Sequence, residues 1–173
     1  QLLAKEHDAE LIYEPILLGA VHKASKNIAP GLVPAKARYM MAYDLPRYIK
    51  RYGIPFKMNP FFPINTLQAM RGCFAAMELG VFDQYIEAVF DAMWVNGINL
   101  GDEASFKGAL VDQGIDADKL FALTGEASIK EQLKENTEKA VNRGCFGAPT
   151  MFVGKDMFFG QDRLEFVEEA LAI

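Results

Sequence analysis

Apolar residues recur every three or four positions over most of the chain from Ala35 to Arg143. This period is typical of helices that bury one face and expose the other. Gly, Asp, Thr and Pro residues interrupt the pattern and mark where successive helices begin and end. The pattern predicts helices over residues 35–52 with a break near 44–46, from 65 or 66 to 80, and over 83–95, 103–113, 117–123 and 126–143.

The pattern changes to a β-type pattern near both ends of the chain. Ala9–Leu18 is rich in β-forming residues and predicts a buried strand, although Pro15 indicates that it is not central along its whole length. Two short apolar runs, 150–154 and 156–159, predict a hairpin with its turn at Gly154–Asp156. The remaining residues, 161–173, read as an amphipathic final helix.

The segment Gly19–Lys36 is predicted to be a long ordered loop, with Pro34 in the first turn of the helix that follows. Long loops inside compact domains are often functional. We therefore treat this segment as a candidate part of a binding site.

The predicted order is helix tail, strand, helical block, hairpin and helix. A thioredoxin-type α/β domain would give this order if its first strand lay upstream of Gln1 and an all-helical domain were inserted after the second strand. We therefore expect residues 1–33 and 140–173 to form a thioredoxin-like domain and residues 34–139 to form the inserted helical domain.

The composition narrows the possible partners. The 173 residues are 51% apolar and 24% charged, which is typical of a globular domain with a proper core. The net charge of -5 disfavours nucleic acid, because phosphate binding depends on clustered Lys and Arg. No apolar run approaches the roughly 20 residues of a membrane span, and no export leader is visible. We expect a cytoplasmic protein without a membrane or nucleic-acid partner.

Cysteine and histidine chemistry also has little support. Cys73 and Cys145 do not form a Cys-x-x-Cys motif, and each reads as a small buried hydrophobe. His7 and His22 are the only histidines, so we expect no metal site.

The segment Gly147-Ala148-Pro149-Thr150 begins the predicted hairpin. If the Ala148–Pro149 bond is cis, the main chain of Ala148 is turned outward and is free to pair with an extended ligand. The alternative is an ordinary trans proline at the start of a strand.

The segment Phe159-Gly160-Gln161-Asp162 ends the hairpin and begins the last helix. The amino end of a helix attracts a carboxylate, and Asp162 could instead bind an ammonium group. The alternative is that Gln161 or Asp162 simply caps the helix. Together, the two segments suit a small peptide-like ligand that carries both charges.

At these motifs the sequence resembles the 2-hydroxychromene-2-carboxylate isomerases and the kappa-class glutathione transferases, which are similar to each other and to DsbA-type oxidoreductases. The resemblance rests on "FGAPTMFV" with "FFGQDRLEFVEEAL", and on "NIAPGLVPAKARYMMAYDL" and "IKEQLKENTEKAVNRG". It spans essentially the whole chain and implies a thioredoxin-like domain with an inserted helical domain that binds glutathione.

The resemblance also implies roles for individual residues. Ala148, before the cis-proline Pro149, would pair its main chain with the cysteinyl part of glutathione. Gln161 and Asp162 would hold the γ-glutamyl end. Phe159 and Gly160 would shape the wall of the site. Asn27 would contact the glycyl end of glutathione or the substrate. His22 or Lys23 would bind a carboxylate of the substrate.

Two departures from the family pattern bear on activity. The family places a Ser next to the glutathione sulfur, in a turn that the resemblance puts upstream of Gln1, so the sequence does not show whether a Ser or a Cys would lie beside that sulfur. Gly31 and Leu32 follow Pro30, where the isomerase pattern has an Asn, and this is more similar to the transferase pattern.

The resemblance implies a glutathione-dependent isomerase that acts on a 2-hydroxychromene-2-carboxylate-like aromatic carboxylate through the glutathione thiolate. It also implies a homodimer. The alternatives are a kappa-type glutathione transferase, a DsbA-type thiol-disulfide oxidoreductase with an upstream Cys-x-x-Cys, and a non-catalytic peptide-binding module.

Overall fold

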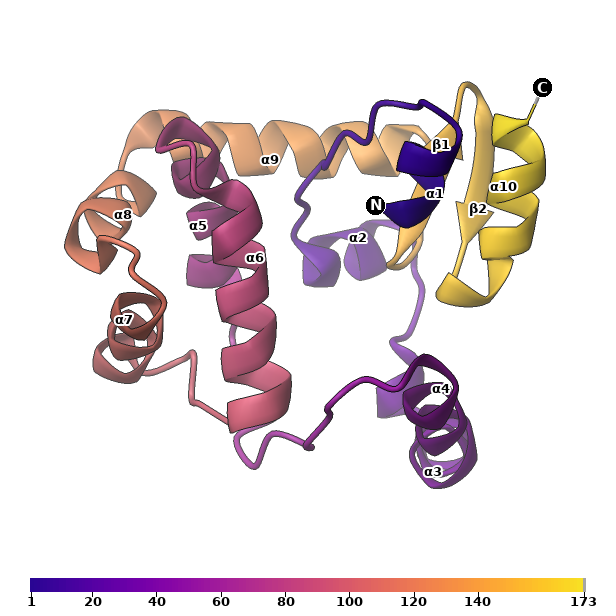
Figure 1. The fold of residues 1–173 in the computed structure, drawn as a ribbon, viewed down its shortest axis with the longest axis horizontal. Coiled ribbons are helices and arrows are strands. Elements are labelled where there is room, and N and C mark those ends of the chain that lie inside the picture. Colours follow the sequence, from indigo (N-terminus) through magenta and orange to yellow (C-terminus); the bar gives the residue numbers. More distant parts are fainter. Residues whose placement is uncertain (173) are drawn as a thin grey trace. The chain divides into compact units, whose positions relative to one another are not determined.

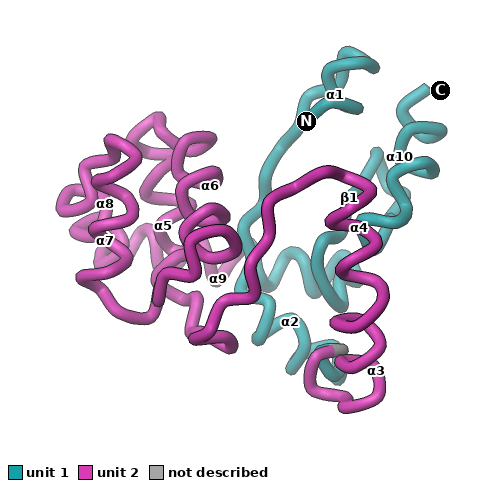
Figure 2. The backbone as a smooth tube through the Cα atoms, turned by 60° about the horizontal axis from the view of Figure 1, so that its bottom comes forward, with its two compact units in different colours: residues 1–29, 136–173 teal, residues 30–135 magenta. Residues whose placement is uncertain are grey.

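The chain divides into two compact units in a computed structural model that describes residues 1–172. Unit 1 comprises residues 1–29 together with the chain from Asn136 onward, and unit 2 comprises Pro30–Glu135 (Figure 2). Unit 1 is therefore built from two separate stretches of the chain, and unit 2 is the stretch inserted between them. The sequence-based domain boundaries, after residues 33 and 139, stay predictions.

Unit 2 is helical throughout its regular structure. Its elements are a 3-10 turn Pro30–Leu32, α3 Pro34–Tyr39, a π-helical turn Met40–Asp44, α4 Leu45–Tyr52, α5 Leu67–Glu78, α6 Phe82–Asp91, a π-helical turn Ala92–Asn96, α7 Glu103–Asp112, α8 Ala117–Thr124 and the first part of α9 Ala127–Asn142 (Figure 1).

Local sequence signals account for many of these boundaries. The irregular turn at 40–44 lies directly before Pro46, which is in the first turn of α4, and Gly53 ends that helix with a φ of +61°. Asp102 caps α7 by accepting a hydrogen bond from the Ser105 N–H, and Asp116 caps α8 in the same way. The predicted helices of this block are therefore confirmed, with ends shifted by a few residues at most.

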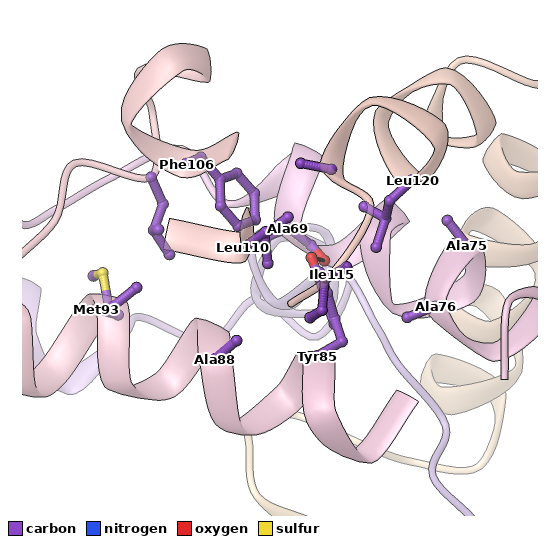
Figure 3. Packing of buried hydrophobic residues seen from close by; sticks show 13 residues of the cluster. Ala69, Ala75, Ala76, Tyr85, Ala88, Met93, Phe106, Leu110, Ile115 and Leu120 are labelled. Atoms are coloured by element: carbon purple, nitrogen blue, oxygen red, sulfur yellow. Dashed lines mark hydrogen bonds between the residues drawn. The ribbon is translucent and has the colours of Figure 1, made fainter. Parts of the chain in front are cut away.

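The core of unit 2 lies between α5, α6, α7 and α8. Tyr85 and Ala88 from α6 and Met93 from the following turn point along one side of that helix toward Phe106 and Leu110 (Figure 3). The Tyr85 hydroxyl is buried and donates a hydrogen bond to the Ala69 carbonyl at 2.7 Å, so its polar end is satisfied inside the core.

Unit 1 contains the short sheet. Its elements are α1 Leu2–Glu6, α2 Leu18–Ala24, the last part of α9, the antiparallel strands β1 Thr150–Val153 and β2 Asp156–Phe159, a 3-10 turn Gln161–Arg163, and α10 Leu164–Leu171 (Figure 1). The register pairs Thr150 with Phe159 and Val153 with Asp156, and Gly154 provides the positive φ that the tight turn requires. Helix α10 packs against β1 and buries Val167. The predicted hairpin is confirmed, and so is the final helix, which begins with the 3-10 turn; residue 173, the last of that predicted helix, lies outside the described residues.

The predicted strand at 9–18 is wrong. The segment before α2 is extended, but the sheet of the described residues contains only β1 and β2. Pro15 has no N–H to offer, and the Leu17 N–H donates instead to the Thr137 hydroxyl at 3.0 Å. Ile12 is 70% exposed, so this part of the run is not buried as predicted. A β-forming run becomes a strand only where a neighbouring strand pairs with it.

The predicted loop at 19–36 is also partly wrong, because α2 occupies its beginning. The run Leu18–Ala24 consists mainly of good helix formers, and it buries Val21 completely. The helix ends before Lys26, which has a φ of +54°. His22 and Lys23 therefore lie in the last turn of a helix and not in a loop.

Candidate functional site

The main chain at Ala148 is exposed and has no internal partner. The Ala148–Pro149 bond is cis, which decides between the two alternatives left open by the sequence. Ala148 is exposed, and no described residue forms a hydrogen bond with its N–H or its C=O. Both groups are therefore available to an extended ligand, as at the edge of a sheet.

A hydrogen bond holds this bend against the end of the hairpin. The Gly160 N–H donates to the Pro149 carbonyl at 3.0 Å, one step beyond the strand pair Thr150–Phe159. Pro149 and Gly160 thus lie side by side, although the whole hairpin separates them in the sequence. The structure brings Ala148, Pro149, Phe159 and Gly160 together, as the two motifs suggested.

Two aromatic rings form an apolar wall at the same place. The ring centroids of Phe146 and Phe159 are 4.5 Å apart, and Phe159 is still 39% exposed. A Cβ at Gly147 would lie 2.6 Å from Phe159 Cε2, so a side chain at this position would displace the ring. Gly147 therefore permits the wall to form beside Ala148.

Gln161 and Asp162 follow in a single 3-10 turn. Gly160 has a φ of +96°, and a Cβ there would lie 2.5 Å from Asp162 Oδ1. The residues at the N-cap positions of this turn and of α10, Gly160 and Arg163, form no side-chain cap hydrogen bond. Asp162 Oδ2 accepts a hydrogen bond from Arg163 Nη1 at 2.6 Å on the surface. Such an exposed ion pair is weak and can be exchanged for a ligand.

Asn27 reaches this region from the end of α2. Its Nδ2 donates to the Phe146 carbonyl at 2.9 Å, and its Oδ1 accepts from the Ile28 N–H. The amide therefore connects the segment after α2 to the bend at Ala148. This contact is a structural role that the sequence did not reveal.

His22 and Lys23 are not brought into direct contact with these groups. His22 is half-buried and Lys23 is exposed, both in the last turn of α2. Within residues 1–172, no hydrogen bond or ion pair joins either side chain to the bend at 146–149 or the turn at 160–162.

Sequence reasoning gave no role in the site to three residues at this place: Phe146, Gly147 and Arg163. A signal for each was present, because all three lie directly beside residues that were singled out. Their roles depend on ring packing and an ion pair that no sequence pattern specifies.

Neither cysteine is exposed: Cys145 is buried and Cys73 is half-buried. Cys145 is 5% exposed, and burial raises the pKa of its thiol. Burial raises the pKa of Cys73 to about 12, and its Sγ lies 3.6 Å from the Ala69 carbonyl. Because only a thiolate is a good nucleophile, both side chains act as packing groups.

We expect the native protein to react slowly with thiol reagents at neutral pH. A pKa of about 12 for Cys73, against an ordinary value of 9.0, gives roughly a thousandfold less thiolate. The labelling rate with a disulfide reagent should be much lower before than after unfolding in urea, and a Cys145→Ala variant assigns the slow phase to Cys73. Labelling of Cys73 at the unfolded rate in the native protein would contradict this assignment.

Other site chemistry finds no support in the described part of the chain. Within residues 1–172, no cluster of three or more His, Cys, Asp or Glu side chains could hold a metal ion. None of the helices described is long and apolar enough to cross a bilayer.

Known proteins are similar to this chain in both sequence and fold. The DSBA-like thioredoxin domain matches residues 1–172. A 2-hydroxychromene-2-carboxylate isomerase of Sphingobium xenophagum is 31% identical, over 98% of this chain and 86% of that protein. A glutathione S-transferase kappa 1 of Homo sapiens is 29% identical, over 91% of this chain and 75% of that protein.

A solved structure of a 2-hydroxychromene-2-carboxylate isomerase superposes with a TM-score of 0.84 and 28% identity. The alignment covers 98% of this chain and 83% of that one. The predicted thioredoxin-like fold and the resemblance to these two families are therefore confirmed.

Proposed function

The chain belongs to the DSBA-like thioredoxin domain family, and from this premise we propose that it is a glutathione-dependent isomerase of an aromatic carboxylate similar to 2-hydroxychromene-2-carboxylate. The observation that carries the proposal is the exposed, unpartnered main chain of Ala148 beside the turn at Gly160–Asp162. Isomerases of this kind and kappa-type glutathione transferases are both relatives of the chain.

The residues present suit glutathione. A tripeptide with an extended backbone needs a donor and an acceptor on the same side, which the Ala148 N–H and C=O supply. Its γ-glutamyl end carries an ammonium group, for which the exposed Asp162 carboxylate is a partner. Gln161 would add hydrogen bonds to the same end, and Asn27 would hold the glycyl end or the substrate from the other side of the bend.

When bound, glutathione would supply a nucleophilic thiolate for an electrophilic aromatic carboxylate. Phe146 and Phe159 would pack against the aromatic part of the substrate and exclude water from it. The Lys23 ammonium group or the His22 imidazole would orient the substrate carboxylate from the last turn of α2.

Replacing Asp162 by Ala should raise the glutathione dissociation constant about tenfold or more, because a hydrogen bond to a charged group contributes about 1.5 to 3 kcal/mol. Isothermal titration calorimetry measures this constant directly. Asp156→Ala is the matched control, since Asp156 is an equally exposed carboxylate at the other end of β2. Equal affinities of the Asp162→Ala variant and the wild type would remove Asp162 from the site.

The activity itself is tested by following isomerisation of 2-hydroxychromene-2-carboxylate with and without glutathione. S-methylglutathione is the control, because it keeps the binding groups and lacks the thiol. Turnover is expected with glutathione and not with the methylated analogue. Turnover at the same rate without any thiol would overturn the proposal.

A kappa-type glutathione transferase is the second candidate. It is favoured by Gly31-Leu32, which follows Pro30 as in the transferase pattern. The two activities differ in the fate of glutathione, which a transferase consumes in equal amount to product and an isomerase regenerates. The cytoplasmic location and the homodimer stay predictions.

A further inference from the structure

A polar pocket lies wholly within unit 2. It has a volume of about 430 Å³ and lies where α5, α7, α8 and the beginning of α9 meet. Its charged and amide lining residues are Gln68, Arg71, Glu103, Lys107, Asp118 and Lys130. None of these residues belongs to the proposed glutathione site.

Arg71, one of the residues that line the pocket, has an unmet hydrogen-bond donor. Its Nε is buried, and no acceptor among the described residues reaches it. Buried donors in folded proteins are nearly always satisfied, by protein, water or a ligand. The guanidinium group presents a planar set of N–H donors that matches two oxygens of a carboxylate or a phosphate.

The carboxylates in the lining are already engaged. Lys107 Nζ lies 2.9 Å from Glu103 and 3.0 Å from Asp118, and it also lies over the Phe121 ring. Hydrogen bonds to Glu103 and then Asp118 raise the pKa of Lys107, so its ammonium group stays charged between the two carboxylates. No ion pair within the described part of the chain engages Arg71 or Lys130, and these two cations are left for an external anion.

Neighbouring contacts keep the wall of the pocket in place. Gln68 Nε2 donates to the buried Thr124 hydroxyl at 2.6 Å, which in turn donates to the Phe121 carbonyl at 2.7 Å. These bonds join α5, which carries Arg71, to α8. The position of Arg71 at the pocket is therefore supported by packing and by hydrogen bonds between the two helices.

We propose that this pocket binds a small anion through a carboxylate or phosphate group on Arg71, with Lys130 as the second cation. The volume admits a metabolite-sized molecule and not only a single ion. The proposal does not depend on the proposed function, because the two sites share no residue.

The test titrates inorganic phosphate and, separately, succinate into the full chain labelled with ¹⁵N, and follows the Nε–H signal of Arg71 by NMR. A saturable shift is expected, with a dissociation constant at least tenfold higher in Arg71→Gln and several-fold higher in Lys130→Gln. Arg51→Gln, an exposed cation at the end of α4, is the matched control and should bind as the wild type does.

The Arg71→Lys variant keeps the positive charge but loses the guanidinium edge that can bind two oxygens. It serves as the test if Arg71→Gln does not fold. Stronger binding of phosphate or of succinate assigns the group that the pocket prefers, and either result supports the site. The absence of a saturable shift up to tens of millimolar, or unchanged affinity in both Arg71 variants, would overturn it. Asp162→Ala should bind phosphate as the wild type does, so failure here is separate from failure of the glutathione proposal.

Discussion

Replacing Gly72 by Ala should lower the free energy of unfolding by about 2 to 5 kcal/mol, from overpacking together with a lost buried hydrogen bond. A Cβ at Gly72 would lie 2.1 Å from the Tyr85 hydroxyl and 2.7 Å from Cζ of the same ring. The ring cannot move without breaking the bond to the Ala69 carbonyl, and it is surrounded by the core of unit 2. A helical glycine is therefore required here by a neighbouring helix and not by its own backbone.

Urea unfolding followed by the fluorescence of Trp94, the one tryptophan of the chain, measures this loss within unit 2. Gly108→Ala is the matched control, because Gly108 also lies inside a helix but has no atom within 4 Å of its would-be Cβ. That change should be neutral or stabilising by up to about 1 kcal/mol. The double variant Gly72→Ala with Tyr85→Phe should recover part of the loss. If the Gly72→Ala variant is as stable as the wild type, α5 and α6 can move apart at no cost, and the prediction is wrong.

Replacing Asn59 by Leu should cost about 2 to 4 kcal/mol, because it leaves several buried polar groups without partners. Asn59 is 2% exposed, and its Nδ2 donates to the carbonyls of Met93 at 3.0 Å and Ile98 at 2.8 Å. Its Oδ1 accepts from the Phe61 N–H at 2.9 Å. The Asn59 amide thus joins the loop between α4 and α5 to the π-helical turn after α6 and to the residues that follow this turn.

The same unfolding measurement on two further variants separates hydrogen bonding from size. Asn59→Asp keeps the shape but places a carboxylate oxygen against two carbonyls, so it should be at least as destabilising. Asn65→Ala removes a single exposed bond to the Leu67 N–H and should cost about 1 kcal/mol. An Asn59→Asp variant as stable as the wild type would show that the two Nδ2 bonds contribute nothing.

Much of the candidate site was predictable because its signals are local. The hairpin follows from two short β-type runs around Gly154. Pro149, whose φ is fixed, and Gly160, which adopts a positive φ that other residues rarely adopt, marked the bend and the turn, although the structure had to decide that the Ala148–Pro149 bond is cis. The register of β1 and β2 then places the two motifs side by side, since a short hairpin joins its own ends. The order of the predicted elements favoured the thioredoxin-like fold even though one of them, the strand at 9–18, was wrong, and the family resemblance supported the same fold.

Only the tertiary structure decided which of these elements find partners. The β-forming run at 9–18 is unpaired because strand formation depends on a neighbour, which no local pattern specifies. Asn27 meets Phe146 across more than a hundred residues of chain, and Arg71 lies at a pocket formed by four helices. Local sequence determines the backbone choices of each segment, whereas long-range packing determines which polar groups are satisfied and which are left for a ligand.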